Sequence, residues 1–157
     1  MKSVIYVLIL AVSLAGGSTV RADSTPAATP APADPALERY TAASTRQDWA
    51  AAAAAMREAL SRDAGNADFH NLYAYALRKG QNPDMDLVFK HYNEALRIDS
   101  KHRGAHEYIG EAYLMVGNVD KAKEHLGALD KLCFFRCAEF TDLKKSIAEY
   151  ESRSAKR

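Results

Sequence analysis

The sequence predicts an all-α protein in which antiparallel helix hairpins repeat along the chain. The segments MREALSRD (residues 56–63) and YNEALRID (residues 92–99) share Glu, Ala, Leu and Asp at identical spacing. Ala52, Val88 and Ala122 recur at roughly the same period of about 34 residues. A hairpin of two helices cannot bury its own apolar faces, so copies with this period are expected to stack on one another. The length of 157 residues is that of one domain.

One hairpin, at residues 99–132, carries the packing pattern most fully. Small residues occupy the positions where two helices must approach closely, and larger apolar residues stand on either side of them. The pattern consists of His106, Ile109, Gly110 and Tyr113, followed by Ala122 and Leu126. These residues have the W-x2-L-G-x2-Y and A-x3-F spacings of the tetratricopeptide signature, and the chain therefore resembles the tetratricopeptide repeat (TPR) family.

The resemblance implies a right-handed superhelix of antiparallel hairpins that ends in a C-terminal capping helix. It places a half repeat at about residues 46–64, full repeats at about 67–100 and about 103–134, and the cap at about 138–152. A short irregular helix is expected to stand in for the missing first half of the first repeat. The whole tetratricopeptide domain is expected to span residues 37–152.

Each expected helix also has a local signal. The alanine run at residues 50–55 has high helix propensity, and residues 64–66 (AGN) are suited to end that helix, with the glycine as a left-handed C-cap. The next two helices are expected to begin near Ala67, with Asp68 as a possible cap, and near Pro83. An apolar stripe with helical spacing follows near the C-terminus, as a capping helix requires. The stripe consists of Phe140, Leu143, Ile147 and Tyr150.

The N-terminus predicts export from the cytoplasm. Lys2 precedes an apolar run at residues 4–14, and Ala22 ends a stretch with an A-x-A-like cleavage pattern. This run is shorter than the ~20 residues of a membrane span, so cleavage after Ala22 and a periplasmic or secreted location are expected. Residues 23–36, rich in proline and alanine, are expected to form a disordered linker, with a proline-rich docking ligand as the alternative.

Cys133 and Cys137 are the two cysteines of the chain. In an exported protein an even pair this close most simply forms a disulfide, which would set the entry angle of the cap. Phe134 and Phe135 are expected to pack nearby. The alternative is thiol-redox chemistry, or binding of copper or zinc with a histidine. The C-x3-C spacing differs from the C-x2-C of thioredoxin-like sites, and two sulfurs alone do not make a metal site.

Other side chains that resemble chemical sites have simpler interpretations. His102 and His106 lie one helical turn apart and could share a metal, although packing or solvated roles explain them. Glu107 and Glu111 resemble a catalytic pair, but on this helix they are expected to face the groove or solvent. No serine elbow, phosphate-binding glycine loop or HExxH motif occurs, so we expect no enzymatic activity, no cofactor and no metal site. The formal net charge of +1 predicts no nucleic-acid surface.

The resemblance further implies a curved groove, formed by the first helix of each hairpin, that holds a peptide or partner segment. Asn71 would bind backbone amides, the aromatic side chains would stack, and Arg78 or Lys79 would meet a carboxylate. The expected groove residues are Asn71, Leu72, Tyr75, Arg78, Lys79, Glu107, Tyr108, Glu111 and Met115. The alternative is an ordinary solvated surface or a self-association face. The full Lys/Asn set of chaperone-tail carboxylate clamps is absent, so that ligand class is not implied.

Together these patterns predict a non-enzymatic periplasmic adaptor, or scaffold, that binds a protein or peptide partner of the cell envelope. The alternatives are self-association and a thiol- or metal-handling role.

Overall fold

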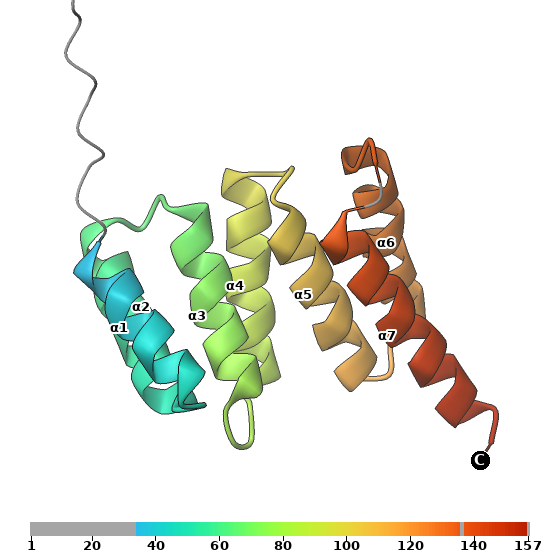
Figure 1. The fold of residues 1–157 in the computed structure, drawn as a ribbon, viewed down its shortest axis with the longest axis horizontal. Helices are drawn as coiled ribbons and strands as arrows, with labels where there is room; N and C mark the ends of the chain where they lie inside the picture. Colours follow the sequence, from blue (N-terminus) through green and yellow to red (C-terminus); the bar gives the residue numbers. More distant parts are fainter. Residues whose placement is uncertain (1–33, 136, 157) are drawn as a thin grey trace, which may run out of the picture. The chain divides into compact units, whose positions relative to one another are not determined.

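The computed structural model describes residues 34–135 and 137–156, in which the chain forms helices and no β-strand (Figure 1). The helices are α1 (Pro35–Thr45), α2 (Trp49–Arg62), α3 (Ala67–Lys79), α4 (Met85–Ile98), α5 (Arg103–Met115), α6 (Val119–Leu132) and α7 (Ala138–Ser154). The predicted all-α class is thereby confirmed. The predicted signal peptide and most of the predicted linker lie outside the described residues.

A polar side chain starts each of the first six helices by accepting a hydrogen bond from a backbone amide in the first turn. The capping residues are Asp34, Asp48, Asn66, Asp84, His102 and Asn118. α3 begins at Ala67, as predicted, although its cap is Asn66 rather than Asp68. α4 begins two residues after the predicted Pro83, because the Asp84 side chain outside the helix caps it. The left-handed glycine is Gly117 (φ 77°) in the α5–α6 turn, and α2 ends instead on extended backbone at Asp63.

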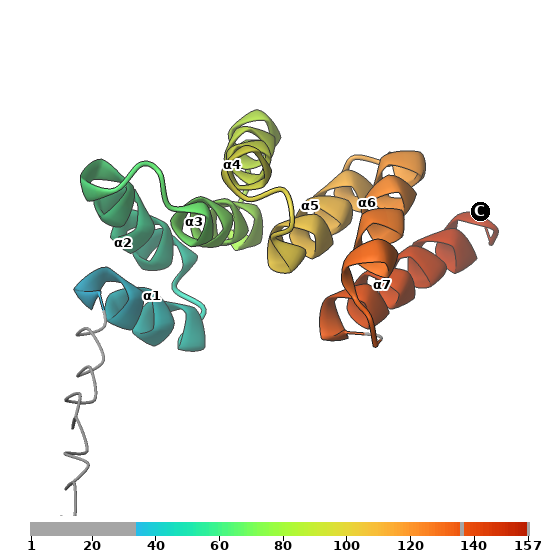
Figure 2. The same ribbon diagram turned by 90° about the horizontal axis from the view of Figure 1, so that it is seen from above.

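Consecutive helices pair as the antiparallel hairpins α1–α2, α3–α4 and α5–α6, and α7 packs against both helices of the last hairpin. Figure 2 shows α1, α3, α5 and α7 along the concave side of the arc, with α2, α4 and α6 on the outside. The first helices of successive hairpins thus form one continuous inner surface.

The apolar core is divided into three clusters along the arc. Their largest fully buried side chains are Met56 in the first cluster, Val88, Tyr92 and Ile109 in the second, and Leu129 and Leu143 in the third. Each cluster joins neighbouring helices only, as expected for a repeat protein in which a hairpin is stabilised by the next one.

Position 110 of α5 requires a small residue because α7, rather than the hairpin partner α6, packs against it. A Cβ atom at this position would lie 2.7 Å from Cδ2 of Leu143 in α7, and the Leu143 side chain is fully buried and cannot move aside easily. The expectation that Gly110 lets α5 approach α6 is therefore corrected. Ala122 is fully buried in the core cluster that joins α6 to α7.

The first repeat is a complete hairpin, which corrects the predicted half repeat at about residues 46–64. α1 is a regular helix of 11 residues that begins at Pro35, inside the predicted linker. Proline suits this place because the first turn needs no backbone donor there, and the Asp34 side chain accepts from the Ala36 amide at 2.7 Å. Ala36, Tyr40 and Ala43 then recur on one face and are buried against α2 and α3.

None of the helices in the described part of the chain has the length and apolar character needed to cross a membrane.

Candidate functional site

Aromatic side chains from successive repeats meet at the inner surface. The ring centroids of Trp49 and Tyr75 are 5.7 Å apart, and those of Tyr75 and Tyr108 are 4.7 Å apart. We call these three residues the aromatic ladder. Tyr40 of α1 belongs to the same region, because burial and then the Tyr75 and Tyr108 hydroxyls raise its pKa. Each ladder ring is only partly buried, so this apolar surface remains open to a ligand.

Arg78 of α3 lies within the ladder and is 8% exposed. Its guanidinium carbon is 5.3 Å from the Tyr75 ring centroid and 5.8 Å from that of Tyr108. Nη2 donates to Glu111 at 2.7 Å, and Nε donates to the Tyr92 hydroxyl at 3.3 Å. Burial disfavours the charge of Arg78, but these two partners outweigh it and raise its pKa. Arg78 is thus already paired within the protein, and the expectation that Arg78 or Lys79 meets a partner's carboxylate stays a prediction.

A line of polar contacts extends from Arg78 across three first helices. Glu111 of α5 accepts from Arg78 and also from Oγ of Ser146 in α7, at 3.2 Å. The line borders a cavity of about 250 Å³. The other residues that line this cavity are Leu114, Met115, Glu149, Tyr150 and Arg153. These contacts hold α3, α5 and α7 in register, so the surface is shaped before a ligand arrives.

Glu107 is the least satisfied charged group of the site. Glu107 is 8% exposed, so of the two expected positions, in the groove or in solvent, it is not fully solvated, and no hydrogen bond or ion pair links its carboxyl to the described residues. Burial, followed by the charges of nearby carboxylates, raises its pKa to about 7. Those carboxylates belong to Glu111, Asp142 and Glu139. Asn71, about one repeat earlier, has a buried Oδ1 without a partner in the described structure.

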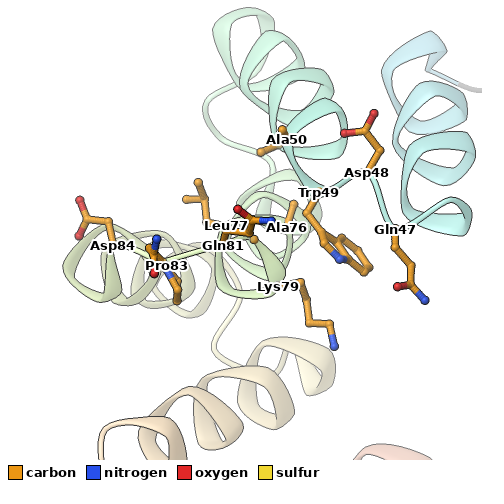
Figure 3. Close-up of a pocket in the computed structure, with 13 residues that line it drawn as sticks. Gln47, Asp48, Trp49, Ala50, Ala76, Leu77, Lys79, Gln81, Pro83 and Asp84 are labelled. Carbon is orange, nitrogen blue, oxygen red and sulfur yellow. The ribbon is translucent and has the colours of Figure 1, made fainter.

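A larger cavity of about 610 Å³ lies between the α1–α2 turn and the α3–α4 loop (Figure 3). Trp49 and Lys79 border it, with Lys79 Nζ 5.8 Å from the Trp49 ring centroid. Trp49 is not among the predicted groove residues, although it lies at this opening. Its position at the first residue of α2, directly after the capping Asp48, was the available signal.

The predicted groove residues divide into two groups in the structure. Tyr75, Arg78, Tyr108, Glu111 and Met115 contact one another, directly or through Arg78. Leu72 instead packs against the first core cluster, and Asn71 is buried. Glu107 lies one helical turn before Glu111 on α5, and Lys79 lies at the larger cavity.

Four histidines form two equivalent pairs that the sequence interpretation missed. Nδ1 of His70 is 2.8 Å from Nδ1 of His91, and Nδ1 of His106 is 2.9 Å from Nδ1 of His125. In each pair Nε2 of the first residue donates to a loop carbonyl, so the second residue donates through Nδ1. The recurrence of both members at about one repeat length was the available signal.

These pairs also bear on the hypothesis that His102 and His106 share a metal ion, because the two histidines have different partners. His106 is bonded to His125, whereas His102 caps α5 and donates to Asp68 at 3.0 Å. Within residues 34–135 and 137–156, no group of three or more histidine, cysteine, aspartate or glutamate side chains has an arrangement that could hold a metal ion.

Cys133 and Cys137 are joined in a disulfide between the end of α6 and the start of α7, which agrees with the predicted bond. Phe134 and Phe135 are 93% and 83% exposed, so the expectation that they pack against the cap is wrong. The bond closes a short loop beyond the ends of both helices, and this loop turns the two rings toward solvent, where they contact each other.

No family model matches the sequence, and no curated protein matches it either. Among solved structures, the chain is similar to one with the description "TPR2B-domain:pHsp70-complex of yeast Sti1", and the TM-score between the two is 0.67. The similarity covers 75% of this chain and 94% of that chain at 19% sequence identity.

The fold is that of a tetratricopeptide repeat domain. This tetratricopeptide fold accounts for the hairpin order and for the concave surface made by alternate helices. The aromatic ladder links the three hairpins of this fold.

Proposed function

We propose that this protein is a non-enzymatic adaptor of the cell envelope that binds a segment of a partner protein along its concave side. The observation that carries the proposal is the aromatic ladder of Trp49, Tyr75 and Tyr108, which runs across three hairpins beside the embedded Arg78. Aromatic residues in a well-packed interface often contribute most of the binding energy between proteins.

The ladder is part of an extended surface rather than an isolated patch. The larger cavity at Trp49 and the smaller one at Glu111 lie at its two ends, and Arg78 connects the ladder to the smaller cavity. Such a surface suits an extended chain several residues long. The similar Sti1 domain was solved as a complex with pHsp70, which supports a protein partner here as well.

The proposed location depends on the signal-like N-terminal sequence and agrees with cysteine usage. A disulfide persists in oxidising compartments such as the periplasm and is rare in the cytosol. The bond also bears on the thiol or metal alternative, because two joined sulfurs offer no thiolate until they are reduced. No observation in the described residues favours that alternative.

Site-specific photo-crosslinking in the native cell envelope tests the adaptor role. A photoreactive lysine analogue replaces Lys79, exposed beside the ladder, or Lys90, exposed on the outer helix α4. We expect adducts with one partner from position 79 and none from position 90. Tyr75→Ala should reduce the adduct, because it removes the central ring of the ladder. Equal adducts from both positions, or adducts that Tyr75→Ala leaves unchanged, would refute binding along the concave side.

A further inference from the structure

We propose that the partner segment presents a basic side chain, lysine or arginine, which pairs with Glu107 beside the Tyr108 ring. This inference rests on the proposed function and specifies the chemistry of the partner.

The charges around Glu107 do not balance within the protein. The charges of Glu111 on α5 and of Glu139 and Asp142 on α7 act on Glu107 and raise its pKa, and we call these four residues the acidic cluster. Arg78 pairs with Glu111 at 2.7 Å, and Arg103 is 3.6 Å from Glu139. Glu107 and Asp142 have no cationic partner among the described residues. When all four carboxylates are ionised, the cluster carries two more negative charges than the two arginines that pair with it.

Burial makes the unpaired state of Glu107 costly. The Glu107 residue is only 8% exposed, so its carboxylate loses part of its hydration, and an ion pair or hydrogen bonds would offset that loss. The described structure supplies neither. A ligand that brings a cation to this place completes an interaction that the folded protein leaves open.

Asn71 gives an independent indication of the same chemistry. Its side chain is 5% exposed, and its Oδ1 accepts no hydrogen bond in the described structure. A Cβ on Gly104 would lie 3.4 Å from the Asn71 amide nitrogen, which places this side chain against the first turn of α5, one turn before Glu107. Both unsatisfied groups are hydrogen-bond acceptors. Lysine and arginine side chains carry several donors and no acceptor.

The aromatic surroundings favour the same ligand. The rings of Tyr75 and Tyr108 already hold one guanidinium, that of Arg78, at 5.3 and 5.8 Å. A ring face attracts cations because its quadrupole is negative there. A partner carboxylate would instead meet the acidic cluster, and Arg78 is no longer free to neutralise it. The groove is thus electrostatically matched to a basic segment.

Selection from a displayed library of random 12-residue peptides tests the inference with the full folded chain as bait. Enriched peptides are synthesised with a fluorescent label, and their affinities are measured by anisotropy. The test variant is Glu107→Gln with Asp142→Asn. The matched control is Glu124→Gln with Asp130→Asn, which makes the same charge change on the outer helix α6. Thermal melting verifies that both variants are folded.

We expect enriched peptides to contain lysine or arginine and to bind the test variant at least about tenfold more weakly, with the control close to the unmodified protein. Basic peptides that bind both variants equally would overturn the inference, since the acidic cluster would not be their site. A neutral or acidic consensus whose binding is weakened by Tyr75→Ala would overturn the inference and leave the adaptor role in place. No enrichment of any peptide would count against both.

Discussion

Replacement of Glu107 by glutamine should stabilise the folded protein at pH 8, although it removes a charge from the candidate binding surface. The side chain keeps its shape, and the amide replaces a buried carboxylate that has no partner in the described structure. Burial and neighbouring carboxylates raise the pKa of this group from 4.5 to about 7, so the folded state binds its proton more tightly than the unfolded state does.

The sign of the effect follows from this difference. Between pH 4.5 and 7 the folded protein holds more protons at Glu107 than the unfolded chain, so stability falls as pH rises through this range. At 1.36 kcal/mol per pKa unit the full penalty is roughly 3 kcal/mol above pH 7 and vanishes below pH 4.5. The glutamine amide retains part of the desolvation cost, so the expected gain at pH 8 is roughly 2 kcal/mol.

Urea unfolding at pH 8 and pH 4.5, followed by circular dichroism, measures this gain. The free energies of unfolding of the variant and the unmodified protein should differ at pH 8 and agree at pH 4.5 within about 0.5 kcal/mol. Glu111→Gln is the control: it deprives the buried Arg78 of its 2.7 Å partner and should cost roughly 2 kcal/mol at pH 8. A Glu107→Gln variant that is less stable at pH 8, or equally shifted at both pH values, would refute this account of the group.

Three further predictions concern packing, acid stability and the disulfide. Gly110→Ala should lower the free energy of unfolding, measured with urea, by about 1–2 kcal/mol, because the new methyl group meets Leu143. Gly127→Ala, with open space around it, should be neutral or stabilising. Equal effects of the two substitutions would contradict the packing role of Gly110. Burial and the partner imidazole lower the pKa of His91 and of His125 from 6.5 to about 4, so stability should fall as pH drops through this range. Replacing both by leucine should flatten the pH profile of the melting temperature, and an unchanged profile would exclude the pairs as its cause. Reduction of the disulfide should lower the free energy of unfolding by about 2 kcal/mol or less, since the closed loop is short. Complete loss of the helical circular dichroism signal on reduction would contradict this prediction.

The fold was largely predictable because its signal is local and repeated. Small and large apolar residues at a regular period specify which faces of each helix are buried, and this pattern needs no knowledge of distant contacts. The first repeat was underestimated for the same reason. Pro35 follows a proline-rich stretch, so composition assigned it to the linker, although a first-turn proline with Asp34 as cap starts a regular helix.

The candidate site was predictable only in part. Residue positions on the first helices placed Tyr75, Arg78 and Tyr108 on one surface, and the structure brings these three together. Their roles depend on contacts between helices that sequence spacing does not specify. The pairing of Arg78 with Glu111 turns an expected ligand-binding cation into a structural one, and it leaves Glu107 as the unpaired charge.

The sequence by itself therefore determined the helical class, the repeat period and the common surface of Tyr75, Arg78 and Tyr108, because these follow from local propensity and from the spacing of side chains along each helix. Only the tertiary structure decided which charges neutralise one another, that Gly110 accommodates Leu143, and that four histidines join in pairs. The physical reason is that each of these contacts depends on how neighbouring helices are rotated and separated, and a change of a few ångströms would exchange the partners.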